Sequence, residues 1–100
     1  MSTRRERVNG VCIAIEVILM AHGCRYFEVE PEEHPNEPEE TRKIGIETDS
    51  APQARRCAHA LVSSGFDLEH IWVSRGSTGR TVWLTLPEDD YLHWGRGHSA

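Results

Sequence analysis

One pattern occurs twice in this chain and limits what it can fold into. An apolar segment of helical length ends at a glycine, and two short alternating segments follow it. Residues 2–23 end at Gly23, and residues 50–65 end at Gly65. Glycine just past an apolar segment is a typical helix C-terminal signal, because glycine adopts positive φ without strain. The pattern predicts the element order α-β-β-α-β-β in a single domain spanning residues 1–100.

The second apolar segment carries the clearest helix signals. Ser50 and Gln53 have the spacing of a capping box, and Pro52 suits the first turn of a helix. At about 100° per residue, the apolar side chains share one face that is predicted to be buried: Ala54, Cys57, Ala58, Leu61 and Val62. The opposite face is predicted to meet solvent: Arg55, Arg56, His59 and Ser63.

The first apolar segment is also predicted to be a helix, with Thr3 and Glu6 as its capping box. Its β-branched residues leave a strand over residues 11–18 as the alternative. The predicted core stripe consists of Val8, Val11, Cys12, Ile15, Ile18 and Leu19. Because a helix buries only one side in a two-layer domain, this stripe is expected to face the sheet.

The far side of this first helix is apolar too, since it carries Ile13, Val17 and Met20. A helix that is apolar all round needs cover on both sides. We expect a second copy in a homodimer, another protein, or the C-terminal tail to cover these residues. In the last case the covering side chains would be Tyr91, Leu92 and Trp94, with residues 95–100 loose.

The alternating segments predict two hairpins. In the first, residues 25–30 place Phe27 and Val29 on one face, and the following strand at 42–48 alternates through Ile44 and Ile46. The opposite face of residues 25–30 is predicted to hold Tyr26, Glu28 and Glu30. An acidic loop, residues 31–41, joins the strands, because its three prolines are incompatible with regular structure.

In the second hairpin, residues 67–87, the turn GSTG sets the register. A turn centred between Ser77 and Thr78 pairs Trp72 with Trp83. The same register pairs Val73 with Val82 and Ile71 with Leu84. The aliphatic pairs then face the helices and the tryptophans face away. The predicted fold is α+β: a two-layer sandwich with a four-stranded antiparallel sheet and two helices on one face, a permuted ferredoxin-like arrangement.

Negative charge is concentrated in one stretch. Residues 28–40 hold seven of the sixteen acids and no Lys or Arg, so the rest of the chain holds nine acids against eleven bases. A solvated linker is the ordinary role of such a segment. A long loop in a compact domain is more often functional, and its carboxylates would speed association with a basic partner protein. The predicted contact residues are Glu32, Glu33, Glu37, Glu39 and Glu40.

The aromatic side chains of the uncovered sheet face are the second predicted contact surface: Tyr26, Trp72 and Trp83. Such side chains often anchor protein interfaces, although a cross-strand tryptophan pair can also serve only to stabilise a hairpin. The two tryptophans, with Arg75, Arg80 and the N-terminal arginines, could instead bind a single-stranded nucleic acid by stacking on its bases. Direct nucleic-acid binding is not favoured, because the charge outside the acidic stretch is nearly balanced.

The cysteines and histidines give no strong signal of a catalytic or metal site. Three cysteines are an odd number, which favours reduced thiols and a cytoplasmic protein. His22, Cys24, Cys57 and His59 are a possible zinc set. However, Cys57 and His59 point in different directions on one helix, and Cys12 and Cys57 fall on buried faces. We therefore predict no metal, no cofactor and no enzyme, with a small metal- or thiol-dependent enzyme as an alternative.

No segment of 18 apolar residues is present, so no membrane span is predicted.

The leading hypothesis is a small non-catalytic protein-binding module with a basic partner. Its most concrete version is a regulator or inhibitor of a nucleic-acid-handling complex. Anti-CRISPR proteins use acidic surfaces of this kind, and the likeness lies in the type of surface and not in the sequence.

Overall fold

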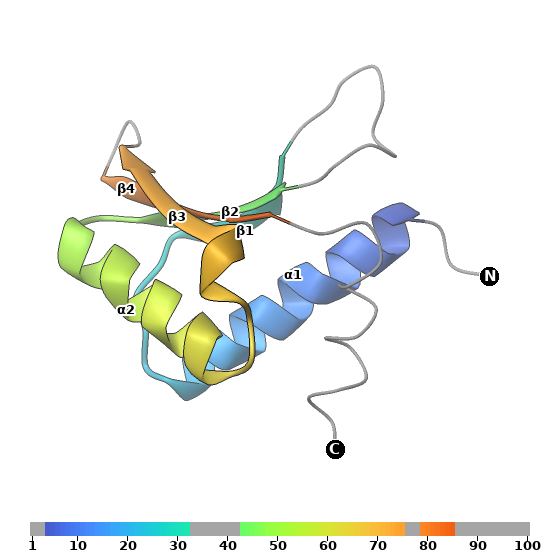
Figure 1. Ribbon diagram of the computed structural model, residues 1–100, viewed down its shortest axis with the longest axis horizontal. Helices are drawn as coiled ribbons and strands as arrows, with labels where there is room; N and C mark the ends of the chain where they lie inside the picture. Colours follow the sequence, from blue (N-terminus) through green and yellow to red (C-terminus); the bar gives the residue numbers. More distant parts are fainter. Residues whose placement is uncertain (1–3, 33–42, 76–78, 86–100) are drawn as a thin grey trace.

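The fold is two-layered, with one four-stranded sheet and two helices on the same side of it (Figure 1). The computed structural model describes residues 4–32, 43–75 and 79–85. In chain order the elements are α1 (Arg4–Ala21), β1 (Glu28–Pro31), β2 (Lys43–Thr48), α2 (Ala51–Ser63), the short 3₁₀ helix η2 (Leu68–His70), β3 (Ile71–Arg75) and β4 (Arg80–Thr85). The predicted α+β class and element order are confirmed, and the alternative strand over residues 11–18 is wrong.

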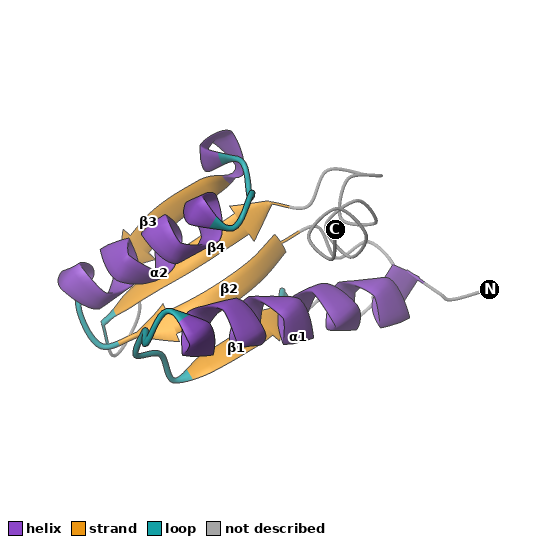
Figure 2. Ribbon diagram, turned by 90° about the horizontal axis from the view of Figure 1, so that it is seen from below, coloured by secondary structure: helices purple, strands orange, loops and turns teal. Residues whose placement is uncertain are grey.

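The sheet order is β1-β2-β4-β3, and every neighbouring pair is antiparallel. Seen from below in Figure 2, α1 crosses the β1–β2 side and α2 the β4–β3 side. The register of the second hairpin is the predicted one, with Trp72 opposite Trp83 and Ile71 opposite Leu84. The permuted ferredoxin-like relationship stays a prediction.

Both helices end in the same hydrogen-bonded glycine motif, as the sequence pattern predicts. After α1, Gly23 has a φ of 68°, and the Cys24 N–H donates to the carbonyl of Leu19 at 2.9 Å. After α2, Gly65 has a φ of 106°, and the Phe66 N–H donates to the carbonyl of Leu61 at 3.0 Å. These two bonds, each between residues five positions apart, satisfy carbonyls that the last helical turn leaves without partners.

The N-terminus of α2 forms only half of its predicted capping box. Ser50 Oγ accepts a hydrogen bond from the Gln53 N–H at 3.3 Å. The Gln53 side chain does not return the bond, because its buried Oε1 has no hydrogen-bond partner among the described residues. The predicted capping residue of α1, Thr3, lies outside the described residues.

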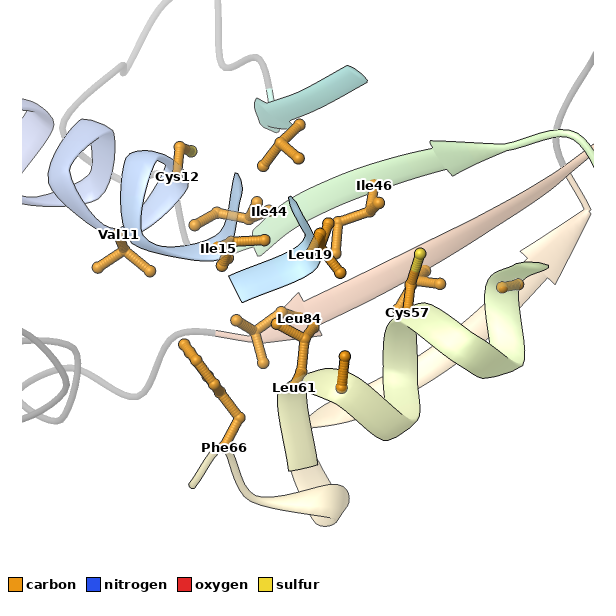
Figure 3. Close-up of a cluster of buried hydrophobic side chains, with 14 of the residues drawn as sticks. Val11, Cys12, Ile15, Leu19, Ile44, Ile46, Cys57, Leu61, Phe66 and Leu84 are labelled. Atoms are coloured by element: carbon orange, nitrogen blue, oxygen red, sulfur yellow. The ribbon is translucent and has the colours of Figure 1, made fainter. Parts of the chain in front are cut away.

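The core lies between the helices and the sheet, where side chains from all the main elements meet (Figure 3). The stripe of α1 that the sequence predicts is buried, with Ile18 only partly so. The buried face of α2 is rotated slightly from the prediction: Ala60 is buried and Val62 is exposed. Val73 is 43% exposed, because β3 is the edge strand and no other described strand pairs with its outer side.

Two of the strands begin later in the chain than the sequence predicts. The chain bends at Phe27, and β1 begins only at Glu28. As a result, Phe27 is exposed while Val29 is buried, which corrects the prediction that both face inward. Likewise, residues 68–70 form η2 and not strand, with Asp67 Oδ1 accepting from the Glu69 N–H at 3.0 Å.

Among the described parts of the chain, no helix combines the length and apolar character that a membrane crossing requires.

The predicted loop residues Glu33, Glu37, Glu39 and Glu40 lie outside the described residues. So do the tail residues Tyr91, Leu92 and Trp94.

Candidate partner-binding face

The sheet has a face that no described helix covers, here called the open face. Along β2 and β4, Ile44, Ile46, Val82 and Leu84 are fully buried toward the helices, so the residues between them point the other way. The strand residues of the open face are Glu28, Glu30, Lys43, Gly45, Glu47, Trp72, Ser74, Thr81, Trp83 and Thr85. Carboxylates and indoles therefore share one surface.

Trp72 and Trp83 form a stacked pair on the open face, as the sequence predicts. Their ring centroids are 6.4 Å apart and their planes differ by 23°. Trp72 on the edge strand is 40% exposed, while Trp83 on the central strand β4 is half-buried. An offset stack of this kind stabilises the hairpin and still leaves aromatic surface in contact with solvent.

The orientation of Trp83 is fixed from both neighbouring strands. On one side its Nε1–H donates to Ser74 Oγ in β3 at 2.9 Å. On the other side its six-membered ring lies across Gly45 in β2, where a Cβ would stand 3.1 Å from Cζ3. Because residue 45 has no side chain, the indole can approach the backbone of β2 this closely.

A hollow of about 190 Å³ opens beside Trp83, toward the β1 edge of the sheet. Gly45, Thr81 and Trp83 line it from the central strands, and Pro31 lines it from the end of β1. Its remaining lining residues are four glutamates: Glu28, Glu30, Glu32 and Glu47. The hollow thus combines an aromatic wall with a strongly acidic rim.

Two of these glutamates are direct cross-strand neighbours, since Glu28 in β1 pairs with Glu47 in β2. Both are exposed. Like charges directly opposite each other in an antiparallel sheet are destabilising. The fold therefore carries an unfavourable charge pair at the mouth of the hollow.

Lys43 is the basic residue of the described strands that points to the open face. Its Nζ lies 5.6 Å from the centre of the Trp72 ring and 3.9 Å from Glu32 Oε1. Both side chains of this ion pair are partly exposed, so the pair contributes little stability. It shows that the open face already holds one ammonium group between an indole and a carboxylate.

Tyr26 is not on the open face, which corrects the prediction for this residue. It is half-buried and packs against the helix-side core. Burial raises the pKa of its phenol, and Glu16 of α1 and Cys57 of α2 add to this, which places the phenol beside the helices. The physical reason is the bend at Phe27, which interrupts the alternation that the sequence argument extends back to residue 25.

Of the predicted acidic contact residues, Glu32 is described, and it lines the hollow. Glu47 is not among the predicted contact residues, because its strand has no run of acidic residues. Strand alternation offered a signal, because Lys43, Gly45 and Glu47 share the face opposite Ile44 and Ile46.

The far side of α1, which is predicted to need cover, is exposed in the structure. Ile13, Val17 and Met20 are 62%, 61% and 70% exposed, and they follow one another at helical spacing. The structure contains one copy of the chain, so the homodimer and the other covers stay predictions.

The possible zinc residues differ in exposure, although the thiols of Cys24 and Cys57 interact with each other. His22, Cys24 and His59 line a shallow hollow of about 450 Å³, together with Arg55 and Arg56. Cys57 instead points into the core (Figure 3). The two guanidinium groups oppose a bound cation, and the described residues contain no group of three His, Cys, Asp or Glu arranged for a metal ion.

Burial controls the chemistry of two thiols. It raises the pKa of Cys57 to about 12, with Cys24 adding to the effect, and the pKa of Cys12 to about 11, with Glu16 and Glu30 adding to it. A protonated thiol is a poor nucleophile and a poor metal ligand. Cys24 is half-buried, with its Sγ 3.7 Å from the carbonyl oxygen of Arg56.

Comparisons of the chain with protein families, curated proteins and solved structures find no match. The geometry of the open face therefore carries the functional argument.

Proposed function

We propose that this protein is a small, non-catalytic, cytoplasmic binding module whose open face meets a basic surface of another protein. One observation carries the proposal: the stacked Trp72–Trp83 pair adjoins a hollow whose rim holds four glutamates. Aromatic side chains in a patch supply much of the binding energy at protein interfaces. Carboxylates around them select a basic partner and speed its association.

The acidic loop extends this charge along the chain, since Glu32 at its start lines the hollow and the loop contains Glu37, Glu39 and Glu40. Basic grooves of this complementary kind are typical of proteins that hold DNA or RNA phosphates. A regulator or inhibitor of a nucleic-acid-handling complex is therefore the class of function that we favour.

Direct binding of single-stranded nucleic acid is the rival function, because the exposed indole of Trp72 could stack on a base. The charges beside the indoles argue against it. Glu28, Glu30 and Glu47 share their surface and would repel phosphate groups.

Affinity capture from the native cell separates the two functions. We expect the wild-type chain to capture a basic protein both with and without nuclease treatment. The variant Glu28→Lys/Glu47→Lys should no longer capture this basic protein. The control, Glu69→Lys in η2, changes an exposed carboxylate outside the hollow and should capture the basic protein as the wild type does.

Two outcomes would contradict the proposal. Capture that nuclease abolishes would indicate nucleic-acid binding, and capture that survives charge reversal would show that the open face is not the contact surface. The variant Glu37→Lys/Glu39→Lys/Glu40→Lys measures separately what the loop contributes.

A further inference from the structure

The hollow beside Trp83 is specific enough to indicate what part of a basic partner enters it. Its volume of about 190 Å³ corresponds to roughly six water molecules, at about 30 Å³ each. Sites for metabolites and cofactors usually begin at about 300 Å³. The hollow is therefore large enough for one side chain.

The aromatic wall of the hollow favours a flat cation. The indole of Trp83 is held by Ser74 and lies against Gly45, so its position is set before any ligand arrives. A guanidinium group stacks on an aromatic ring with little loss of hydration, whereas an ammonium group is strongly hydrated.

The acidic rim favours a ligand that donates several hydrogen bonds in one plane. Glu28 and Glu47 lie opposite each other on neighbouring strands, so a cation between them would offset their repulsion. A guanidinium has five N–H donors in a planar fork that matches carboxylates, while an ammonium acts as a point charge.

The fold contains an internal example of the same arrangement. Lys43 places its ammonium group near the Trp72 ring and Glu32. Glu32 also lines the hollow, so this ammonium group lies at one side of it, while Glu28 and Glu47 pair with each other farther along β1 and β2.

We propose that the hollow binds the guanidinium group of one arginine side chain of the partner protein. This rests on the proposed function and adds the chemistry of the central contact. The guanidinium stacks on the indole of Trp83, and its N–H groups donate to the carboxylates of Glu28 and Glu47.

NMR titration of the ¹⁵N-labelled full chain tests this directly with three small probes: N-acetyl-arginine amide, N-acetyl-lysine amide and N-acetyl-citrulline amide. Citrulline has nearly the shape of arginine and no charge. We expect the arginine probe to shift the Trp83 indole and Gly45 amide resonances saturably, and the citrulline probe to leave them in place. The lysine probe should bind more weakly than the arginine probe.

The variants Glu28→Gln and Glu47→Gln keep side-chain size and remove charge. Each should weaken binding of the arginine probe by about tenfold, the usual effect of losing one hydrogen bond to a charged group. Glu69→Gln should bind as the wild type does. Equal shifts from citrulline or lysine, or unchanged binding in both hollow variants, would overturn the arginine assignment.

A tetra-arginine peptide distinguishes failure of this inference from failure of the proposed function. If the peptide shifts the Trp72 and Trp83 resonances while the arginine probe leaves Gly45 unmoved, the hollow is not the site and the basic-partner function stands. If neither probe moves any open-face resonance, both proposals are contradicted.

Discussion

The indole of Trp83 lies across Gly45 so closely that a Cβ at residue 45 would stand 3.1 Å from Cζ3 and 3.3 Å from Cη2. This contact joins the two central strands on the open face. It also forms the wall of the acidic hollow, so a single backbone position controls the shape of the candidate site.

Gly45→Ala should displace the Trp83 ring by a few tenths of an ångström and disturb its hydrogen bond to Ser74. The expected result is a shifted Trp83 indole resonance and weaker binding of the tetra-arginine peptide. Gly10→Ala is the matched control, because a Cβ there meets no atom within 4 Å. That helix substitution should leave the indole unchanged and stabilise the fold by about 0.5–1 kcal/mol. An unmoved indole in Gly45→Ala would contradict the role given to this glycine.

Much of the fold could be predicted from local signals. The glycines at 23 and 65 mark both helix ends, and the sequence GSTG predicts the pairing of Trp72 with Trp83 that the strand register confirms. These features depend on residues close in sequence, where turn chemistry and side-chain alternation act directly.

The candidate site was harder to predict, because it depends on which strands become neighbours. Glu28 meets Glu47, and Gly45 meets Trp83, only once the order β1-β2-β4-β3 is known. The error at Tyr26 has a different cause: one bend at Phe27 reverses the face of the residue before it. Successive side chains of a strand point to opposite faces of the sheet, so one bend changes the predicted face of every residue beyond it.

The exposed stripe of α1 predicts self-association. If Ile13, Val17 and Met20 form a homodimer contact, Val17→Glu should convert dimer to monomer, because it buries a charge in an apolar interface. Size-exclusion chromatography with light scattering measures the mass. Arg55→Glu, on the exposed face of α2, is a control that should stay dimeric. A wild-type chain that is monomeric at all accessible concentrations would contradict the homodimer.

The buried thiols predict a loss of stability in alkali. The pKa of Cys57 rises from 9.0 to about 12 on folding, so above pH 9 the unfolded chain releases this proton and the folded chain retains it. The protonated thiol of Cys57 therefore contributes fully to the free energy of unfolding below pH 9. This contribution is lost as the pH rises toward 12. In denaturant unfolding, the free energy of unfolding of Cys57→Ala should fall less steeply between pH 9 and 12 than that of the wild type. The smaller side chain should also lower the stability of the variant by an amount that does not depend on pH. Parallel pH profiles would show that the thiol is not protected from ionisation.

The most direct test of the central claim is Glu47→Lys, measured for both stability and binding. If the carboxylates of the open face are there for a cationic partner, replacing the Glu28–Glu47 repulsion by an attractive pair should raise the unfolding free energy by about 0.2–1 kcal/mol. The same change should abolish binding of the tetra-arginine peptide. Glu69→Lys carries the same change in net charge outside the hollow and should retain binding. Unimpaired peptide binding by Glu47→Lys would contradict the account.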